Sequence, residues 1–329
     1  MMKWSVMAIL VLTAGTHSQT TSPTPAPQPT PNATLERQRQ EEERRRQNNE
    51  FYRLRNVTPG NARRRPLPAS TLLDLKKIYR EATAKEKEAL APEAADIQML
   101  RDLLRQKNTG LVRLADNSDC AGSPYVISAS TKCMEYPMPG NGAFYSFRKA
   151  GYSIDRIADL RYRNGRFEVG GIFQHGILTK LGDVELGSVT ASTPGMEFLI
   201  NFSPSRDLDS AVRVGRELQA GIDRNGFEYR QVVNTAENMT YALRSIAYRG
   251  TVMRSFNGIV YDELSFDKRF DVTVVFRVVR LHDDGSVTIA WKRILKKESP
   301  KLRMDTPDQR KTVDNKFTAA IAVDGEQGK

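Results

Sequence analysis

The fold class is decided by residues 157–172, which read IADLRYRNGRFEVGGI. Asn164 and Gly165 tolerate the positive φ angles that a two-residue type I′ hairpin turn requires. Pairing the flanking strands about that turn sets aromatic against aromatic, opposite charges together and aliphatic against aliphatic: Tyr162 with Phe167, Arg161 with Glu168, and Leu160 with Val169. The sequence therefore predicts a β-hairpin here and also its register.

A longer hairpin is predicted over residues 270–295. Apolar side chains alternate from Phe270 to Val278, a polar turn follows at 282–286, and alternation resumes on the return strand. Both faces are apolar near the middle, which indicates a central, covered strand pair. Other strands are expected over 196–202 and 241–247, with weaker candidates at 143–149, 177–186 and 226–233, and 208–220 fits either helix or strand.

Two short helices are expected before the strands. Thr71 and Asp74 have the spacing of a helix start, and apolar residues follow at helical spacing. Pro92 suits the first turn of a second helix, which Gly110 would end. Each helix has one apolar face, so both should dock on the domain that follows.

The order of these elements predicts an α+β fold, an N-terminal helical extension followed by a mainly antiparallel β domain. No long helices alternate with the strands, so the sheet should be antiparallel, in a sandwich or partly closed barrel. Five regions are expected: a signal peptide at 1–18, a Pro/Thr-rich linker and charged stalk, helical or disordered, at 19–65, the helical extension at 66–109, the strand-rich domain at 110–297, and a polar tail at 298–329.

The first 18 residues have the layout of a signal peptide. Lys3 precedes an apolar run from Ser5 to Gly15, and small residues follow. An uncleaved signal anchor is the alternative, but the run is about half of the roughly 20 residues that span a bilayer. We expect a secreted or periplasmic protein without a transmembrane anchor after cleavage.

Cys120 and Cys133 are the only cysteines of the chain. In an oxidising compartment they can form a disulfide that closes a short loop and stabilises the fold by about 3 kcal/mol. The alternative is two buried thiols that pack as small apolar groups.

The formal net charge of +11 is unevenly distributed. Residues 110–291 contain 21 Lys and Arg against 21 Asp and Glu, so the excess lies toward the two ends of the chain. A basic tail is usually a solvated segment, and this distribution argues against a specific nucleic-acid partner.

Few residue types for catalysis are present. Once a signal peptide is removed, His175 and His282 are the only imidazoles. The motifs of serine hydrolases, HExxH metalloproteases and phosphate loops do not occur, so we expect no cofactor and no metal site, and the chain favours a non-enzyme. A glycosidase, however, needs only two acids across a cleft at any sequence spacing, which leaves an exported hydrolase with an Asp/Glu pair as the alternative.

Four residues are candidates for ligand binding. Tyr125, Tyr136 and Tyr145 lie in or near the cysteine-bounded loop, where rings could stack on sugars or proteins. His175 ends a glycine-rich stretch where backbone could approach a ligand. Core packing of the rings and a structural bend at His175 are the competing interpretations.

These observations favour an exported, non-catalytic binding or structural domain of the cell envelope or extracellular space, whose partner would be a glycan or an envelope protein. Four N-x-[ST] triplets would matter only if the source glycosylates exported proteins: Asn32, Asn56, Asn201 and Asn238.

Overall fold

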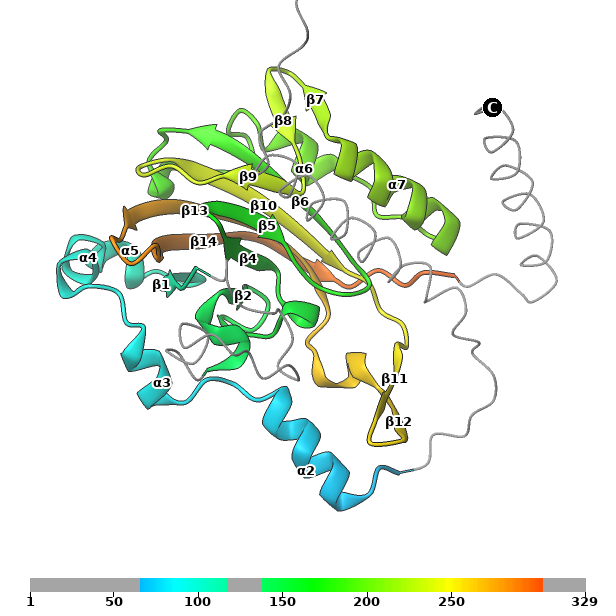
Figure 1. The fold of residues 1–329 in the computed structure, drawn as a ribbon. Helices are drawn as coiled ribbons and strands as arrows, with labels where there is room; N and C mark the ends of the chain where they lie inside the picture. The colour runs from blue at the N-terminus through cyan, green and yellow to red at the C-terminus, as the bar shows by residue number, and fades with distance from the viewer. Residues whose placement is uncertain (1–65, 117–137, 304–329) are drawn as a thin grey trace, which may run out of the picture. The chain divides into compact units, whose positions relative to one another are not determined.

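The computed structural model describes residues 66–116 and 138–303 (Figure 1). The predicted signal peptide, linker and stalk lie outside these residues. In the described part, a helical segment precedes two five-stranded antiparallel sheets, which confirms the predicted α+β class. The two sheets pack against each other and are not closed into a barrel.

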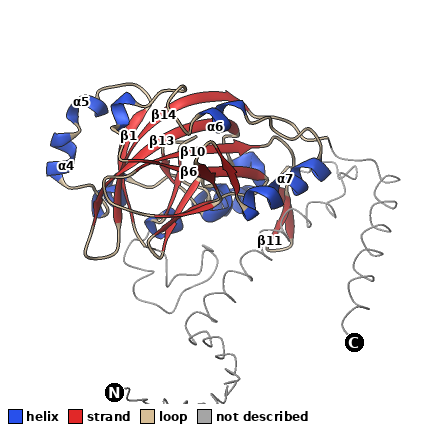
Figure 2. Cartoon of the chain, turned by 90° about the horizontal axis from the view of Figure 1, so that it is seen from above, coloured by secondary structure: helices blue, strands red, loops and turns tan. Residues whose placement is uncertain are grey.

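The first sheet pairs strands from both ends of the described chain. Its order is β1(Thr109–Leu114), β14(Val287–Glu298), β13(Phe270–Leu281), β10(Thr240–Ala247) and β6(Gln174–Gly182), side by side in Figure 2. The predicted long hairpin is β13–β14, and it is central because β1 flanks it on one side and β10 on the other. The predicted strand at 241–247 falls within β10.

The second sheet contains the predicted hairpin of residues 157–172. Its order is β3(Gly151–Tyr152), β2(Phe144–Ser146), β4(Leu160–Arg163), β5(Arg166–Val169) and β9(Val232–Asn234). Strands β4 and β5 pair in the predicted register, and Asn164 and Gly165 have φ of 50° and 65°. Leu178 of β6 exchanges two backbone hydrogen bonds with Arg230, of 2.7 and 2.8 Å, which joins the edge of the first sheet to the segment entering β9.

Two small hairpins and four short 3₁₀ turns complete the strand-rich part. The hairpins are β7(Ile222–Arg224) with β8(Phe227–Tyr229), and β11(Met253–Phe256) with β12(Ile259–Asp262). The 3₁₀ turns are η2(Pro139–Gly142), η3(Asp155–Ile157), η4(Leu186–Ser188) and η5(Glu263–Phe266).

The prediction of a strand over 196–202 is wrong, because this segment forms helix α6(Glu197–Asn201). Alternate apolar residues in so short a run also fall at i and i+4, which share one face of a helix. Phe198 and Phe202 have that spacing, and their ring centroids lie 5.7 Å apart.

The ambiguous segment 208–220 is helix α7(Leu208–Ala220). Asp207 caps it, because its carboxylate accepts hydrogen bonds from the backbone N–H and the hydroxyl of Ser210 at 2.8 and 2.9 Å. Gly221, with φ of 94°, follows the last turn. Figure 1 shows α7 beside the β7–β8 hairpin.

The helical extension contains four short helices instead of the two expected: α2(Ala69–Ile78), α3(Ala84–Ala89), α4(Ala94–Met99) and α5(Arg101–Leu104). Helix α3 begins at an unpredicted capping box between Thr83 and Glu86. The fully buried side chains of Leu75 and Leu90 belong to different apolar clusters, so one straight helix could not place both. Asp96 of α4 is buried against Arg280, at 2.7 Å, which docks the extension on β13.

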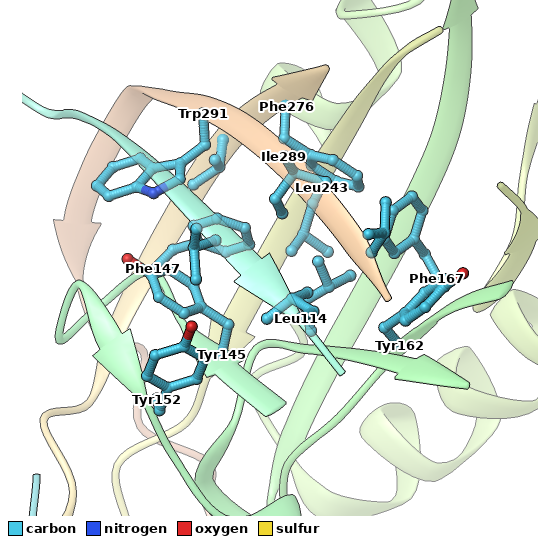
Figure 3. Packing of buried hydrophobic residues seen from close by; sticks show 14 of the residues in the cluster. Leu114, Tyr145, Phe147, Tyr152, Tyr162, Phe167, Leu243, Phe276, Ile289 and Trp291 are labelled. Atoms are coloured by element: carbon cyan, nitrogen blue, oxygen red, sulfur yellow. The ribbon is translucent and has the colours of Figure 1, made fainter. Parts of the chain in front are cut away.

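Apolar side chains cover both faces of the first sheet. One face packs on the second sheet, where aromatic rings from both sheets point toward one another in Figure 3. The other face packs against α5, α6 and α7 through Leu103, Leu199 and Leu218. Beyond β14 the chain remains packed, since Ser299 and Leu302 are buried.

Candidate functional site

The predicted ligand-binding ring of Tyr145 lies in the core between the sheets. Its centroid is 5.2 Å from that of Phe147, 6.1 Å from Tyr152 and 6.2 Å from Trp291 (Figure 3). Burial raises the pKa of the Tyr145 hydroxyl above its usual range. A ring that stacks on a ligand needs an exposed face, and this ring is 6% exposed.

Four other predicted residues fall outside the described residues. These are the candidate rings and the predicted disulfide: Tyr125, Tyr136, Cys120 and Cys133.

His175 is a completely buried histidine of β6 with two protein partners. Its Nε2 donates to the backbone carbonyl of Ala211 at 2.9 Å, and its Nδ1 accepts from the Tyr248 hydroxyl at 3.0 Å. The carbonyl can only accept, so the proton of the neutral ring is on Nε2. Burial lowers the pKa of His175 to about 4, even though the carbonyl bond opposes the shift. The neutral imidazole therefore links β6 to α7 and to Tyr248, the residue that follows β10.

In the glycine-rich stretch before His175, residues 172–174 are buried against protein, and Gly170 and Gly171 are half-buried. Gly171 and Phe173 have φ of 97° and 54°. The carbonyl oxygens of Ile172 and Phe173 both accept hydrogen bonds from Arg269. A Cβ at Gly250 would lie 2.4 Å from Phe173 Cε1, so the bend is closely packed by backbone.

A buried ionic cluster lies where the two sheets meet, and no sequence pattern predicts it. We define it by Arg148, Asp159, Asp267 and Arg269. Arg148 Nε donates to Asp159 at 2.8 Å and Nη1 to Asp267 at 2.7 Å, with all three side chains 0% exposed. Arg269 Nη1 donates to Asp267 at 2.9 Å.

The remaining donors of the ionic cluster bind backbone and neutral side chains. Arg148 Nη2 donates to the carbonyl of Ile157 at 2.9 Å, and Arg269 Nε to that of Tyr248 at 3.0 Å. Asp159 also accepts from Ser146 of the second sheet and Ser245 of the first. Burial and then the neighbouring Arg148 charge lower the pKa of Arg269 to about 10, so it stays charged at neutral pH. Lys149 Nζ lies 3.9 Å from Asp267 and adds a third cation beside the two acids, and the cluster connects the sheets.

A second buried acid, Glu263, holds the helical extension. It accepts from the Tyr79 hydroxyl at 2.8 Å, Arg156 Nη2 at 2.7 Å and Arg254 Nη1 at 3.0 Å. Burial alone would raise its pKa, but the hydrogen bond and charge of Arg156 and the charge of Arg254 outweigh burial and lower it. Its protonated form, which a general acid would need, is thereby disfavoured.

Three basic side chains occur at the open end of the β13–β14 hairpin, opposite its turn. We define the basic cluster by Lys268, Arg293 and Lys296. Lys296 pairs with Val272, and Arg293 pairs with Val274. Both valines face the core between the sheets, so the two cations lie on that same face.

A β-bulge makes this arrangement possible. Leu295 pairs with Thr273 and Arg293 with Val274, which leaves Ile294 as the extra residue. Strict alternation would put Arg293 and Lys296 on opposite faces, and the bulge brings them to one face.

Comparison with known proteins gives no relatives. No protein-family model matches the chain, and neither the curated proteins nor the solved structures contain a match. Among the helices of residues 66–116 and 138–303, none is long and apolar enough to cross a bilayer.

Proposed function

We propose that this protein is an exported, non-catalytic binding or structural domain of the cell envelope or extracellular space. One observation supports a non-catalytic role: the buried ionisable groups described above are bonded to other groups of the protein. The ionic cluster, Glu263 and His175 each bond to side chains or backbone of the same chain.

Export is supported by the sequence layout. A charged start, a short apolar run and small residues precede a Pro/Thr-rich segment, the order expected of a signal followed by a spacer. The domain would then meet envelope or extracellular molecules, among which glycans and envelope proteins are the partners that we propose.

The alternative is a hydrolase with an Asp/Glu pair. One pair of described acids that share a cation is Asp159 and Asp267, which both bond Arg148. Both side chains are 0% exposed, so neither can reach a substrate in this conformation. A general acid needs a raised pKa, whereas the described acids with a resolved shift, Glu86, Asp207, Glu228, Glu263 and Asp284, all have lowered pKa values.

Export is tested by fractionating cells and sequencing the amino terminus of the recovered protein. We expect extracytoplasmic protein that begins near residue 19, and a variant lacking residues 1–18 should stay in the cytoplasm. Full-length protein with Met1 or Met2 in the cytosol would refute export.

The binding role is tested by screening the purified mature protein against wall polysaccharides, glycans and envelope extracts. The same preparation is incubated with glycoside and ester substrates. We expect saturable binding without turnover, and turnover at enzyme-like rates by a homogeneous preparation would refute the non-catalytic role.

A further inference from the structure

Two cations of the basic cluster, Arg293 and Lys296, lie on one face of β14, opposite residues of β13 that are two positions apart. The Lys296 ammonium lies 3.7 Å from the centroid of the Phe270 ring. Phe270 itself is partly buried against the core between the sheets, so this ring is fixed. Lys268, two residues before Phe270, and Lys296 are both exposed.

None of the three cations has a described acid as an ion-pair partner. Of the neighbouring acids, Asp271 binds Arg244 at 2.7 Å and Asp267 lies in the ionic cluster, whereas Glu298, whose side chain is 89% exposed, faces Arg249 at 3.5 Å. Partial burial, and then the charges of Arg293 and Lys268, lower the pKa of Lys296. The cations therefore repel one another, and a bound anion would relieve that repulsion.

Elsewhere in the described residues, several arginines form ion pairs with acidic side chains. Arg113, Arg277 and Arg280 each pair with an acid at 2.6 or 2.7 Å. The basic cluster differs from these sites because its positive charge is uncompensated. Residues 292–303 hold six Lys and Arg and one acid, and the structure places the first of them on β14 and not in a tail.

We propose that the basic cluster of Lys268, Arg293 and Lys296, with Phe270 at its base, binds an acidic polysaccharide; this inference rests on the proposed export. Cations close together on one strand pair fit carboxylate or sulfate groups spaced along a sugar chain. Duplex nucleic acid instead requires a long basic surface, and the acids that balance residues 110–291 work against one.

The test compares two variants of the full chain that each lose three positive charges. The first is Lys268→Gln/Arg293→Gln/Lys296→Gln. The control is Lys76→Gln/Lys85→Gln/Lys87→Gln, which changes exposed lysines of α2 and α3. Because Arg293 also bonds Asn108, a Lys268→Gln/Lys296→Gln variant keeps that contact and separates binding from folding.

The probes are polygalacturonate, neutral dextran, a short DNA duplex and anionic lipid vesicles, each titrated at several salt concentrations. For polygalacturonate we expect the cluster variant to lose affinity about tenfold at low salt and the control less than about twofold, with a shallower salt dependence only for the cluster variant. The double variant should show an intermediate loss, and dextran should not bind.

Equal losses in both triple variants would overturn the assignment, since the binding would then reflect net charge. Tighter binding to the DNA duplex or the vesicles than to polygalacturonate would overturn the choice of partner. Failure of the proposed export is a separate result: cytosolic full-length protein refutes export, whereas a selective loss in the cluster variant still supports an anion site.

Discussion

The buried neutral ring of His175 predicts a specific pH dependence of stability. The unfolded chain takes up a proton near the ordinary histidine pKa of 6.5, whereas the folded protein resists it until about 4. Between these values the unfolded state binds more protons, so the free energy of unfolding falls as the pH falls. Between about pH 7 and pH 5, His175 alone should lower the free energy of unfolding by about 2 kcal/mol.

The assay is urea unfolding of the wild type and of His175→Gln at both pH values. The Nε2 of glutamine can still donate to the Ala211 carbonyl, but the side chain does not titrate. The variant should be less stable near neutral pH, and its deficit should shrink by about 2 kcal/mol at the lower pH. His282→Gln is measured in parallel, because burial lowers the pKa of His282 as well and its contribution to the pH dependence has to be separated from that of His175. A deficit for His175→Gln that is the same at both pH values would refute the burial argument.

Three further outcomes are expected. Arg148→Met should reduce the free energy of unfolding by about 3 to 5 kcal/mol in urea titrations, because two buried carboxylates lose their shared cation; a loss under about 1 kcal/mol would contradict this role. Tyr79→Phe should cost about 2 kcal/mol, since it removes a hydrogen bond to a buried charge, and limited proteolysis should cut the helical extension sooner; unchanged cleavage would argue against the contact. Exported, unreduced protein should have no alkylatable thiol at Cys120 or Cys133, as intact mass would show, and free thiols at both would exclude the disulfide.

Local signals were the predictable part of the fold. The β4–β5 register followed from a turn and three side-chain pairs that are adjacent in sequence. The β13–β14 hairpin followed from twelve-residue strands with clear alternation. The prediction of a strand from Met196 to Phe202 is wrong because, over so few residues, period two and the i, i+4 spacing of a helix coincide.

The candidate site was much less predictable. Arg148 and Asp267 are 119 residues apart in sequence, and no spacing rule connects them. The basic cluster depends on one extra residue, Ile294, and simple alternation would separate Arg293 from Lys296. Of the predicted residues, His175 could be recognised as a bend residue from its glycines, but its partners Tyr248 and Ala211 could not.

The pairing of β1 with β14 has a consequence for how the chain matures. Thr109 lies opposite Lys292, so the first strand of the sheet has no partner until the last strand has been synthesised. Contacts of such sequence separation form late and slowly. A nascent chain that ends before Val287 should remain open and sensitive to protease, because the sheet lacks its closing strand until that point.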